Sequence, residues 1–126
     1  MNERKTILIC DDEEGVRESL NLILGEDYNL AFTGNGNEAL RYLEKANPDL
    51  IIMDIKMPQK NGLEALKELR QKKPNIKVIM VTGYQSVETA AEASKYGILE
   101  YITKPFESSL VKETVQKVLK SPNSIT

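Results

Sequence analysis

Short apolar runs alternate with amphipathic stretches along the whole chain. The runs are rich in Ile, Leu, Val and Met and have the length of β-strands. Most of them are continuous rather than alternating, as expected for strands of a parallel sheet that is covered on both faces. They lie at Thr6–Cys10, Asp49–Met53, Lys77–Val81 and Leu99–Thr103, with a weaker run at Tyr28–Thr33.

Between these runs, apolar residues recur at the spacing typical of an α-helix. The first helix has Val16, Leu20, Ile23 and Leu24 on one face, and Gly25 predicts that it ends there with a positive φ. Five strands alternating with five helices predict a single-domain, doubly wound α/β fold with a parallel sheet. The later helices are expected around Ala39, Leu40 and Leu43, around Leu63, Leu66 and Leu69, at Val87–Tyr96, and at Glu107–Lys120.

Length and composition agree with one small domain. The chain has 126 residues, of which 40% are hydrophobic and 29% charged, as in ordinary globular proteins. We expect this domain to span residues 1–120, and the aperiodic end Ser121–Thr126 to be a flexible tail or a cut linker. No stretch approaches the ~20 apolar residues of a membrane span, and the N-terminus is polar, so a cytoplasmic location is expected.

The charge balance and two residue types restrict the function. Lysine and arginine number 17 against 19 acidic residues, a net charge of -2, which argues against binding to nucleic acid or an anionic membrane. Histidine is absent, which excludes histidine bases and the usual histidine-containing zinc sites. The single cysteine, Cys10, cannot form an internal disulfide and is expected in the core. Any chemistry must therefore use carboxylates, hydroxyls and lysines.

Three of the five aspartates directly follow expected strands. Asp11 and Asp12 follow the first strand, and Asp54 follows Asp49–Met53. The carboxyl ends of parallel strands form the ligand-binding edge of such a sheet. One aspartate there is usually a turn or cap residue, but carboxylates about 4 Å apart repel by roughly 4 kcal/mol at an effective dielectric constant of 20. Three together therefore predict a cation site, and an all-oxygen site with room for water and phosphate suits Mg²⁺.

Two further strand ends supply a hydroxyl and an ammonium group. Thr82 follows Lys77–Val81, and Lys104 follows the last strand. A hydroxyl and a cation that face three carboxylates are the groups needed to hold a transferring phosphoryl group. Together with a carboxylate nucleophile and a metal ion, they predict a phosphoryl-transfer site.

In this arrangement the sequence resembles the receiver domains of two-component response regulators. The resemblance runs from about Lys5 to Lys120 and implies a flavodoxin-like (βα)5 fold with strand order 2-1-3-4-5 and a cis Lys104–Pro105 bond. The matching motifs are ILICDD with Asp11 and Asp12, MDIKMP around Asp54, NGLEALKELR after it, VTG with Thr82, and YITKPF with Tyr101, Lys104 and Pro105.

The resemblance implies a phosphoryl acceptor and a metal site. Asp54 would take a phosphoryl group from a phosphohistidine of a sensor histidine kinase or a histidine phosphotransfer protein. Asp12, Asp54 and the backbone carbonyl of Lys56 would bind Mg²⁺ directly, and Asp11 would act mainly through water. The domain would be a phosphoacceptor switch rather than an enzyme in the usual sense, although it would catalyse its own phosphorylation and slow dephosphorylation.

The resemblance also implies how the signal leaves the site. Thr82 would donate its hydroxyl to one phosphoryl oxygen and Lys104 would pair with another, while the ring of Tyr101 rotates inward as Thr82 moves. The signalling face would comprise the helix Val87–Tyr96, the strand Leu99–Thr103 and the helix Glu107–Lys120. It would act on a downstream effector or a fused output domain, and two copies could pair through it after phosphorylation.

Three alternatives to the receiver interpretation fit the sequence less well. A Mg²⁺-dependent phosphatase with an aspartate nucleophile usually has a second Asp two residues later, where this chain has Lys56. A flavodoxin would need a phosphate-binding loop where this chain has four acidic residues, and a receiver that acts only as a binding module would not need every site residue.

Glu13 and Glu14 are assigned to the first helical turn, where anions suit the helix dipole, and Tyr84 is expected to shield the phosphorylated aspartate.

Overall fold

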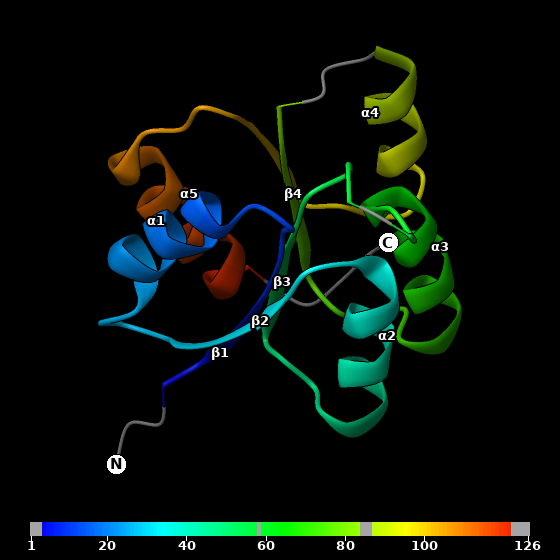
Figure 1. Cartoon of the computed structure of the whole chain (residues 1–126), viewed down its shortest axis with the longest axis horizontal. Coiled ribbons are helices and arrows are strands. Elements are labelled where there is room, and N and C mark those ends of the chain that lie inside the picture. The colour runs from blue at the N-terminus through cyan, green and yellow to red at the C-terminus, as the bar shows by residue number, and fades with distance from the viewer. Residues whose placement is uncertain (1–3, 58, 84–86, 122–126) are drawn as a thin grey trace.

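The computed structural model of the chain describes residues 4–57, 59–83 and 87–121. Its centre is a parallel sheet with the strand order β2-β1-β3-β4-β5, and a helix follows each strand (Figure 1). The predicted α/β fold and strand order are therefore confirmed. The elements are β1 Thr6–Cys10, α1 Glu14–Leu24, β2 Asn29–Thr33, α2 Gly36–Lys45, β3 Leu50–Met53, α3 Gly62–Lys72, β4 Val78–Thr82, α4 Val87–Ser94, β5 Glu100–Thr103 and α5 Ser108–Lys120.

Two layers of helices cover the sheet. Helices α1 and α5 lie on one side, and α2, α3 and α4 lie on the other (Figure 1). Side chains of the central strands alternate between the two layers, so that Leu8 and Met53 pack in one core and Ile7 and Ile52 in the other. Because both faces are covered, the central strands β1, β3 and β4 are apolar at nearly every position, which explains their continuous runs in the sequence.

The register of the strands brings the polar residues to one edge. Strands β1 and β3 pair up to their last residues, so Asp11 and Asp54, which follow them, leave the sheet at the same level. Strands β4 and β5 end together at Thr82 and Thr103. The backbone N–H of Lys104 then donates to the carbonyl of Thr82 at 3.0 Å, which continues the pairing to the edge.

At the opposite edge, basic side chains donate to carbonyl groups at the ends of the helices. Such carbonyls have no partner within the helix, and positive charge is favourable beside them. The half-buried Arg70 of α3 donates to two residues that follow α4, at 2.6 Å to Tyr96 and 3.2 Å to Gly97. The other contacts are Arg4 to Gly25 after α1, Lys73 to Ala46 after α2, and Lys77 to Val118 and Ser121 at the end of α5.

Two helix ends differ from the sequence-based prediction. The helix expected at Val87–Tyr96 ends at Ser94, because the next three N–H groups, ending with Gly97, bond to carbonyls three residues earlier and tighten the turn. Gly97 then has a φ of 76°. Helix α1 ends before Gly25 as predicted, but Gly25 has a φ of -66°, so the predicted positive φ is wrong.

The boundaries of the five strands and of the last helix agree with the prediction to within one residue. Strand β4 includes Thr82, and α5 begins at Ser108 with Glu107 as its N-cap. The Lys104–Pro105 bond is cis, as the resemblance implied. Among the described helices, none has the length and apolarity that crossing a membrane requires. Of the expected tail Ser121–Thr126, residues 122–126 lie outside the described part of the chain.

Gly62 connects the start of α3 to the carboxyl end of β3. Its N–H donates to the carbonyl of Ile55 at 2.8 Å. A Cβ atom at this position would lie 2.0 Å from the backbone carbonyl oxygen of Asp54, which is far inside contact distance. The absence of a side chain at Gly62 is therefore what allows α3 to begin directly beside Asp54.

We predict that Gly62→Ala destabilises the protein by about 2 kcal/mol or more, because the methyl group displaces the backbone of Asp54. Gly15→Ala is the matched control, since a Cβ atom at this position in α1 meets nothing within 4 Å. That change should stabilise by about 0.5–1 kcal/mol, the helix preference for alanine. Urea unfolding measures both, and equal effects of the two changes would contradict the close approach at Gly62.

Candidate functional site

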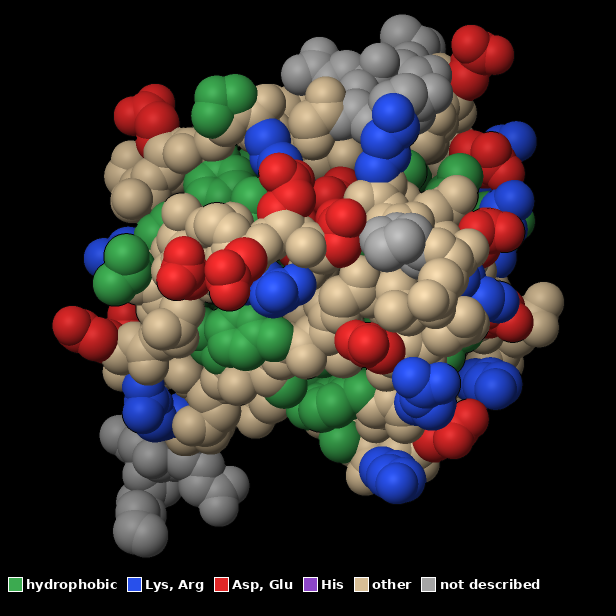
Figure 2. All heavy atoms as spheres, viewed as in Figure 1, with side chains coloured by type: hydrophobic (Ala, Val, Ile, Leu, Met, Phe, Trp, Pro, Cys, Tyr) green, Lys and Arg blue, Asp and Glu red, His purple; other side chains and the backbone are tan. Residues whose placement is uncertain are grey.

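An open cleft of about 510 Å³ lies at the carboxyl edge of the sheet. Acidic side chains gather near the upper middle of the space-filling view, with basic side chains beside them (Figure 2). The cleft is lined by residues at or just after the ends of β1, β3, β4 and β5, namely Asp12, Glu13, Asp54, Lys56, Thr82, Gly83 and Lys104. The structure therefore brings most of the predicted site residues together.

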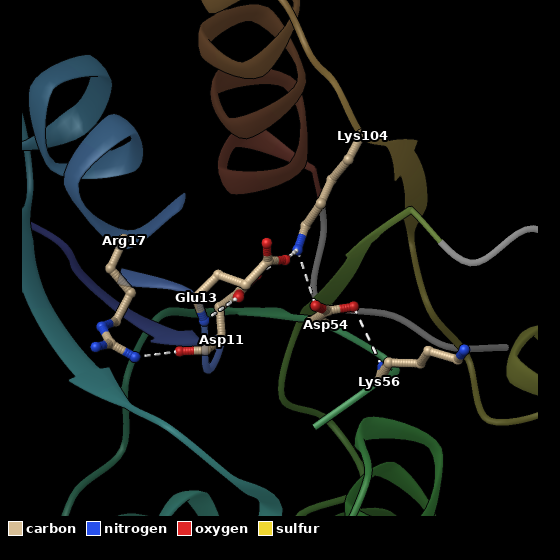
Figure 3. Close-up of polar contacts among 6 residues, drawn as sticks. All are labelled: Asp11, Glu13, Arg17, Asp54, Lys56 and Lys104. Carbon is tan, nitrogen blue, oxygen red and sulfur yellow. Dashed lines mark hydrogen bonds and ion pairs between the residues drawn. The ribbon is translucent and has the colours of Figure 1, made fainter. Parts of the chain in front are cut away.

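The ammonium group of Lys104 contacts three carboxylates at once. Its Nζ atom lies 2.8 Å from Asp11 Oδ2, 2.8 Å from Glu13 Oε1 and 2.8 Å from Asp54 Oδ2. An ammonium group has three N–H donors. Each donor of Lys104 can therefore be assigned to one carboxylate, and the close-up shows the lysine reaching across the cleft toward them (Figure 3).

The exposure of these groups differs widely. The side chains of Asp11 and Asp54 are 3% and 4% exposed, and that of Lys104 is 14% exposed, whereas Glu13 is 61% exposed. Burial acts against the charge of Lys104, but hydrogen bonds to the three carboxylates outweigh it and raise the pKa of Lys104 above its ordinary value. Lys104 therefore remains a cation at neutral pH.

Asp11 is held firmly by its backbone and its side chain. Its Oδ1 atom accepts a hydrogen bond from the N–H of Glu13 at 2.9 Å, and its carbonyl accepts one from Nη1 of Arg17 at 2.5 Å (Figure 3). Burial raises the pKa of Asp11, and the charge of Asp54 adds to the rise, although the bonds from Lys104 and Glu13 oppose it. The three carboxylates that contact Lys104 thus carry more negative charge than its ammonium group neutralises.

The geometry of the three aspartates fits a small cation. One carboxylate oxygen each of Asp11, Asp12 and Asp54 lie within 4.8 Å of one another, and Asp12 is exposed to the cleft. Mg²⁺ binds oxygen at 2.0–2.1 Å, so two ligands on opposite sides of the ion are about 4 Å apart. Small side-chain adjustments therefore suffice to bring these oxygens around one ion. The N–H of Lys56 donates to Asp54 Oδ1 at 3.3 Å, which places the backbone of Lys56 beside the cluster.

Thr82 and Tyr101 connect the cleft to the α4 side of the sheet. Thr82 is 1% exposed and lines the cleft. Tyr101 is partly buried, packs against the core on the side of α2, α3 and α4, and pairs in register with Met80, two residues before Thr82. By strand alternation, Thr82 points to the same face as Met80. The two predicted switch residues therefore share the sheet face that α4 covers.

Two residues of the site were not found from the sequence. Glu13 was assigned to the helix dipole, but it is the N-cap of α1, makes no side-chain cap hydrogen bond, and contacts Lys104 instead. Arg17 was given no role, although it fixes the backbone of Asp11. A glutamate directly after an acidic pair at a strand end is the one signal that could have indicated a contact with the cleft.

Two other sequence-based expectations concern residues near the site. Cys10 is buried as predicted, accepts a hydrogen bond from the hydroxyl of Thr33 at 3.0 Å, and has its pKa raised to about 12 by burial. It is therefore a core residue rather than a reactive thiol. The predicted shielding residue, Tyr84, lies outside the residues that the structure describes.

Comparison with known proteins gives a consistent result. A family model described as the response regulator receiver domain matches residues 7–116. The chain is 37% identical over 120 residues to sporulation initiation phosphotransferase F of Bacillus subtilis, which covers 94% of this chain and 95% of that protein. It is 39% identical over 114 residues to the regulatory protein AtoC of Escherichia coli, covering 90% of this chain but only 25% of AtoC. A CheY-like receiver domain from Methanospirillum hungatei has a similar structure, with a TM-score of 0.89, 33% identity, and 93% and 94% of the two chains covered.

We predict that Asp11→Asn stabilises the protein at neutral pH in metal-free buffer. A raised pKa means that the folded state binds the proton more tightly than the unfolded chain, so the ionised carboxylate opposes folding above that pKa. The advantage of the variant should shrink as the pH falls through the pKa of Asp11. Urea unfolding from about pH 8 down to about pH 4, near the ordinary pKa of an aspartate, measures the difference.

The exposed Asp27, in the turn after α1, provides the control Asp27→Asn, which should show no such pH-dependent gain. A variant Asp11→Asn that is less stable than the wild type at neutral pH would contradict the prediction.

Proposed function

The chain belongs to the response regulator receiver domain family, and from this premise we propose that it accepts a phosphoryl group on Asp54. The donor would be a phosphohistidine of a sensor histidine kinase or of a histidine phosphotransfer protein. One observation carries the proposal. Asp54 is a buried carboxylate held 2.8 Å from the ammonium of Lys104, at an open cleft that Asp12 and Thr82 also line.

The transfer needs little covalent chemistry from the protein. One carboxylate oxygen of Asp54 attacks the phosphorus, the new P–O bond forms, and the P–N bond to the donor imidazole breaks, with its electron pair leaving on the imidazole nitrogen. Such transfers depend mainly on positioning and on neutralising the charge of the phosphoryl oxygens. Lys104 would take that role, which its contact of 2.8 Å with Asp54 Oδ2 supports, and the N–H of Lys56 donates to Asp54 Oδ1 at 3.3 Å.

Receiver domains bind Mg²⁺ through acidic residues, and the cluster in this chain fits that ion. We propose that Asp12, Asp54 and the backbone carbonyl of Lys56 hold it directly, with Asp11 acting through water. When bound, Mg²⁺ would neutralise charge on the phosphoryl oxygens. Asp11 and Lys104 also hold each other in position across the same cluster.

The proposed signal runs from the phosphoryl group through Thr82 to the α4 side of the sheet. Thr82 would donate its hydroxyl to a phosphoryl oxygen, which draws it toward the cleft. Tyr101 lies on the same sheet face and would turn into the space that Thr82 leaves. Phosphorylation adds about 1.5 to 2 negative charges, enough to bias two arrangements of neighbouring elements. The elements that respond would be α4, β5 and α5.

The proposal extends to the setting of the domain. Residues 1–120 would form the receiver, located in the cytoplasm, and its face would act on a downstream effector or a fused output domain, with pairing of two copies after phosphorylation. The chain spans only a quarter of AtoC but nearly all of phosphotransferase F, so both arrangements occur among its relatives. Catalysis of its own phosphorylation and slow dephosphorylation is part of the same proposal.

The first test is the intact mass after incubation with acetyl phosphate, with and without Mg²⁺. The wild type should gain one phosphoryl group only with Mg²⁺, and Asp54→Asn should gain none because it lacks the nucleophile. Asp49→Asn is the matched control, since this exposed aspartate precedes β3 at the opposite edge of the sheet and should leave uptake unchanged. A folded wild type that gains no mass would favour the alternative of a binding module.

The second test separates phosphorylation from the response to it. Thr82→Ala should still gain the phosphoryl group, but the amide chemical shifts of α4, β5 and α5 should change less than in the wild type. Thr103→Ala is the control, because this exposed threonine is the partner of Thr82 in β5 and should leave the response intact. A full response in Thr82→Ala would contradict the coupling role of Thr82.

A further inference from the structure

The contact between Glu13 and Lys104 has no part in the proposed transfer. Lys104 already has two carboxylate partners, Asp11 and Asp54, each at 2.8 Å and each nearly fully buried. These two follow the strand ends β1 and β3, so they hold the ammonium group within the cleft without further help. The third N–H donor of Lys104 is directed to Glu13, also at 2.8 Å.

Glu13 is the partner that can be exchanged most easily. Its side chain is 61% exposed, so its carboxylate can leave Lys104 and be hydrated at once. The carboxylate of Asp11 lacks that route, because leaving Lys104 would strand a buried charge. The backbone N–H of Glu13 also anchors Asp11, so the backbone at this position stays fixed while the side chain moves.

A phosphoryl group on Asp54 needs the same donor. Its oxygens carry about two negative charges and form the strongest hydrogen bonds with charged donors. In the unphosphorylated protein all three N–H donors of Lys104 are assigned to carboxylates. Esterification of Asp54 removes its carboxylate charge and frees one donor, so the phosphoryl oxygens gain a second donor only if Asp11 or Glu13 gives one up. Of these two, Glu13 gives it up at least cost.

We propose that Glu13 is a positioning residue that occupies the phosphoryl place on Lys104 in the unphosphorylated protein and competes with the phosphoryl group for that place. The inference rests on the proposed function of Asp54 and Lys104. It assigns to Glu13 a role in setting how readily the site accepts a phosphoryl group. Glu13 thereby favours the unphosphorylated state without touching the acceptor itself.

The test uses beryllofluoride, a phosphoryl mimic, in saturating Mg²⁺, with its affinity measured from amide chemical shifts. Glu13→Gln should bind it about two- to fivefold more tightly than the wild type, the range expected for an exposed ion pair. Glu14→Gln is the matched control, because Glu14 is the adjacent exposed glutamate in the first turn of α1. Its affinity should stay within about 1.5-fold of the wild type at physiological salt.

A second measurement separates a contact with Lys104 from a general effect of charge. In the background Lys104→Met, the change Glu13→Gln should lose its advantage over Glu14→Gln. A Glu13→Gln variant that binds beryllofluoride no more tightly than Glu14→Gln, or that keeps its advantage without Lys104, would overturn the role of Glu13 alone. A folded wild type that binds no beryllofluoride and gains no mass from acetyl phosphate would overturn the proposed function together with it.

Discussion

The carboxyl edge of the sheet depends on one ammonium group shared by carboxylates that repel one another. Asp11 follows β1, Asp54 follows β3 and Lys104 follows β5, so the contact joins three strands of the sheet at the point where they end. Without Lys104, two nearly buried carboxylates would face each other with no counter-ion. The register of the parallel strands brings these two carboxylates together. A cation bound beside them would reduce their repulsion, and so would the loss of the carboxylate charge of Asp54.

The rest of the fold keeps this edge open and accurate. The core on both faces of the sheet fixes the strands, and the tight approach of Gly62 places α3 directly against the backbone of Asp54. Asn61 and Glu64 form a capping box at the start of α3, which satisfies N–H groups beside the cleft. The position of Asp54, the proposed acceptor, is therefore set by packed backbone, as a transfer reaction governed by positioning would require.

The sequence predicted those parts of the site that depend on strand ends. Asp11, Asp54, Thr82 and Lys104 each adjoin a continuous apolar run, and a parallel sheet aligns the ends of such runs. The direction of the Glu13 side chain could not be predicted in this way. A long, exposed glutamate has many rotamers, and its partner is 91 residues away in the chain.

The spacing of apolar residues also failed to predict the details of two helix ends. The apolar spacing continues through Tyr96, but the turn at Gly97 and the carbonyl contacts made by Arg70 end α4 at Ser94. A glycine directly after a helix often has a positive φ, but the backbone of Gly25 keeps the right-handed helical conformation. Local hydrogen bonds shape both helix ends, and the long-range contacts of Arg4 and Arg70 with the carbonyls beyond them leave no periodic signal in the sequence.

The hold of Arg70 on the segment after α4 has a mechanical consequence. The end of α4 is tied to α3 through Tyr96 and Gly97, and an ion pair between Lys67 and Glu92 at 2.7 Å adds a second tie near that end. Contacts at one end of a short helix restrict the motion of that end, so that a tilt displaces mainly the other end. A tilt of about 10° over a helix of roughly 12 Å moves the free end by about 2 Å and the fastened end hardly at all. If the proposed displacement of Thr82 occurs, these contacts would make it largest in the half of α4 nearest the cleft and smallest at the end tied to α3.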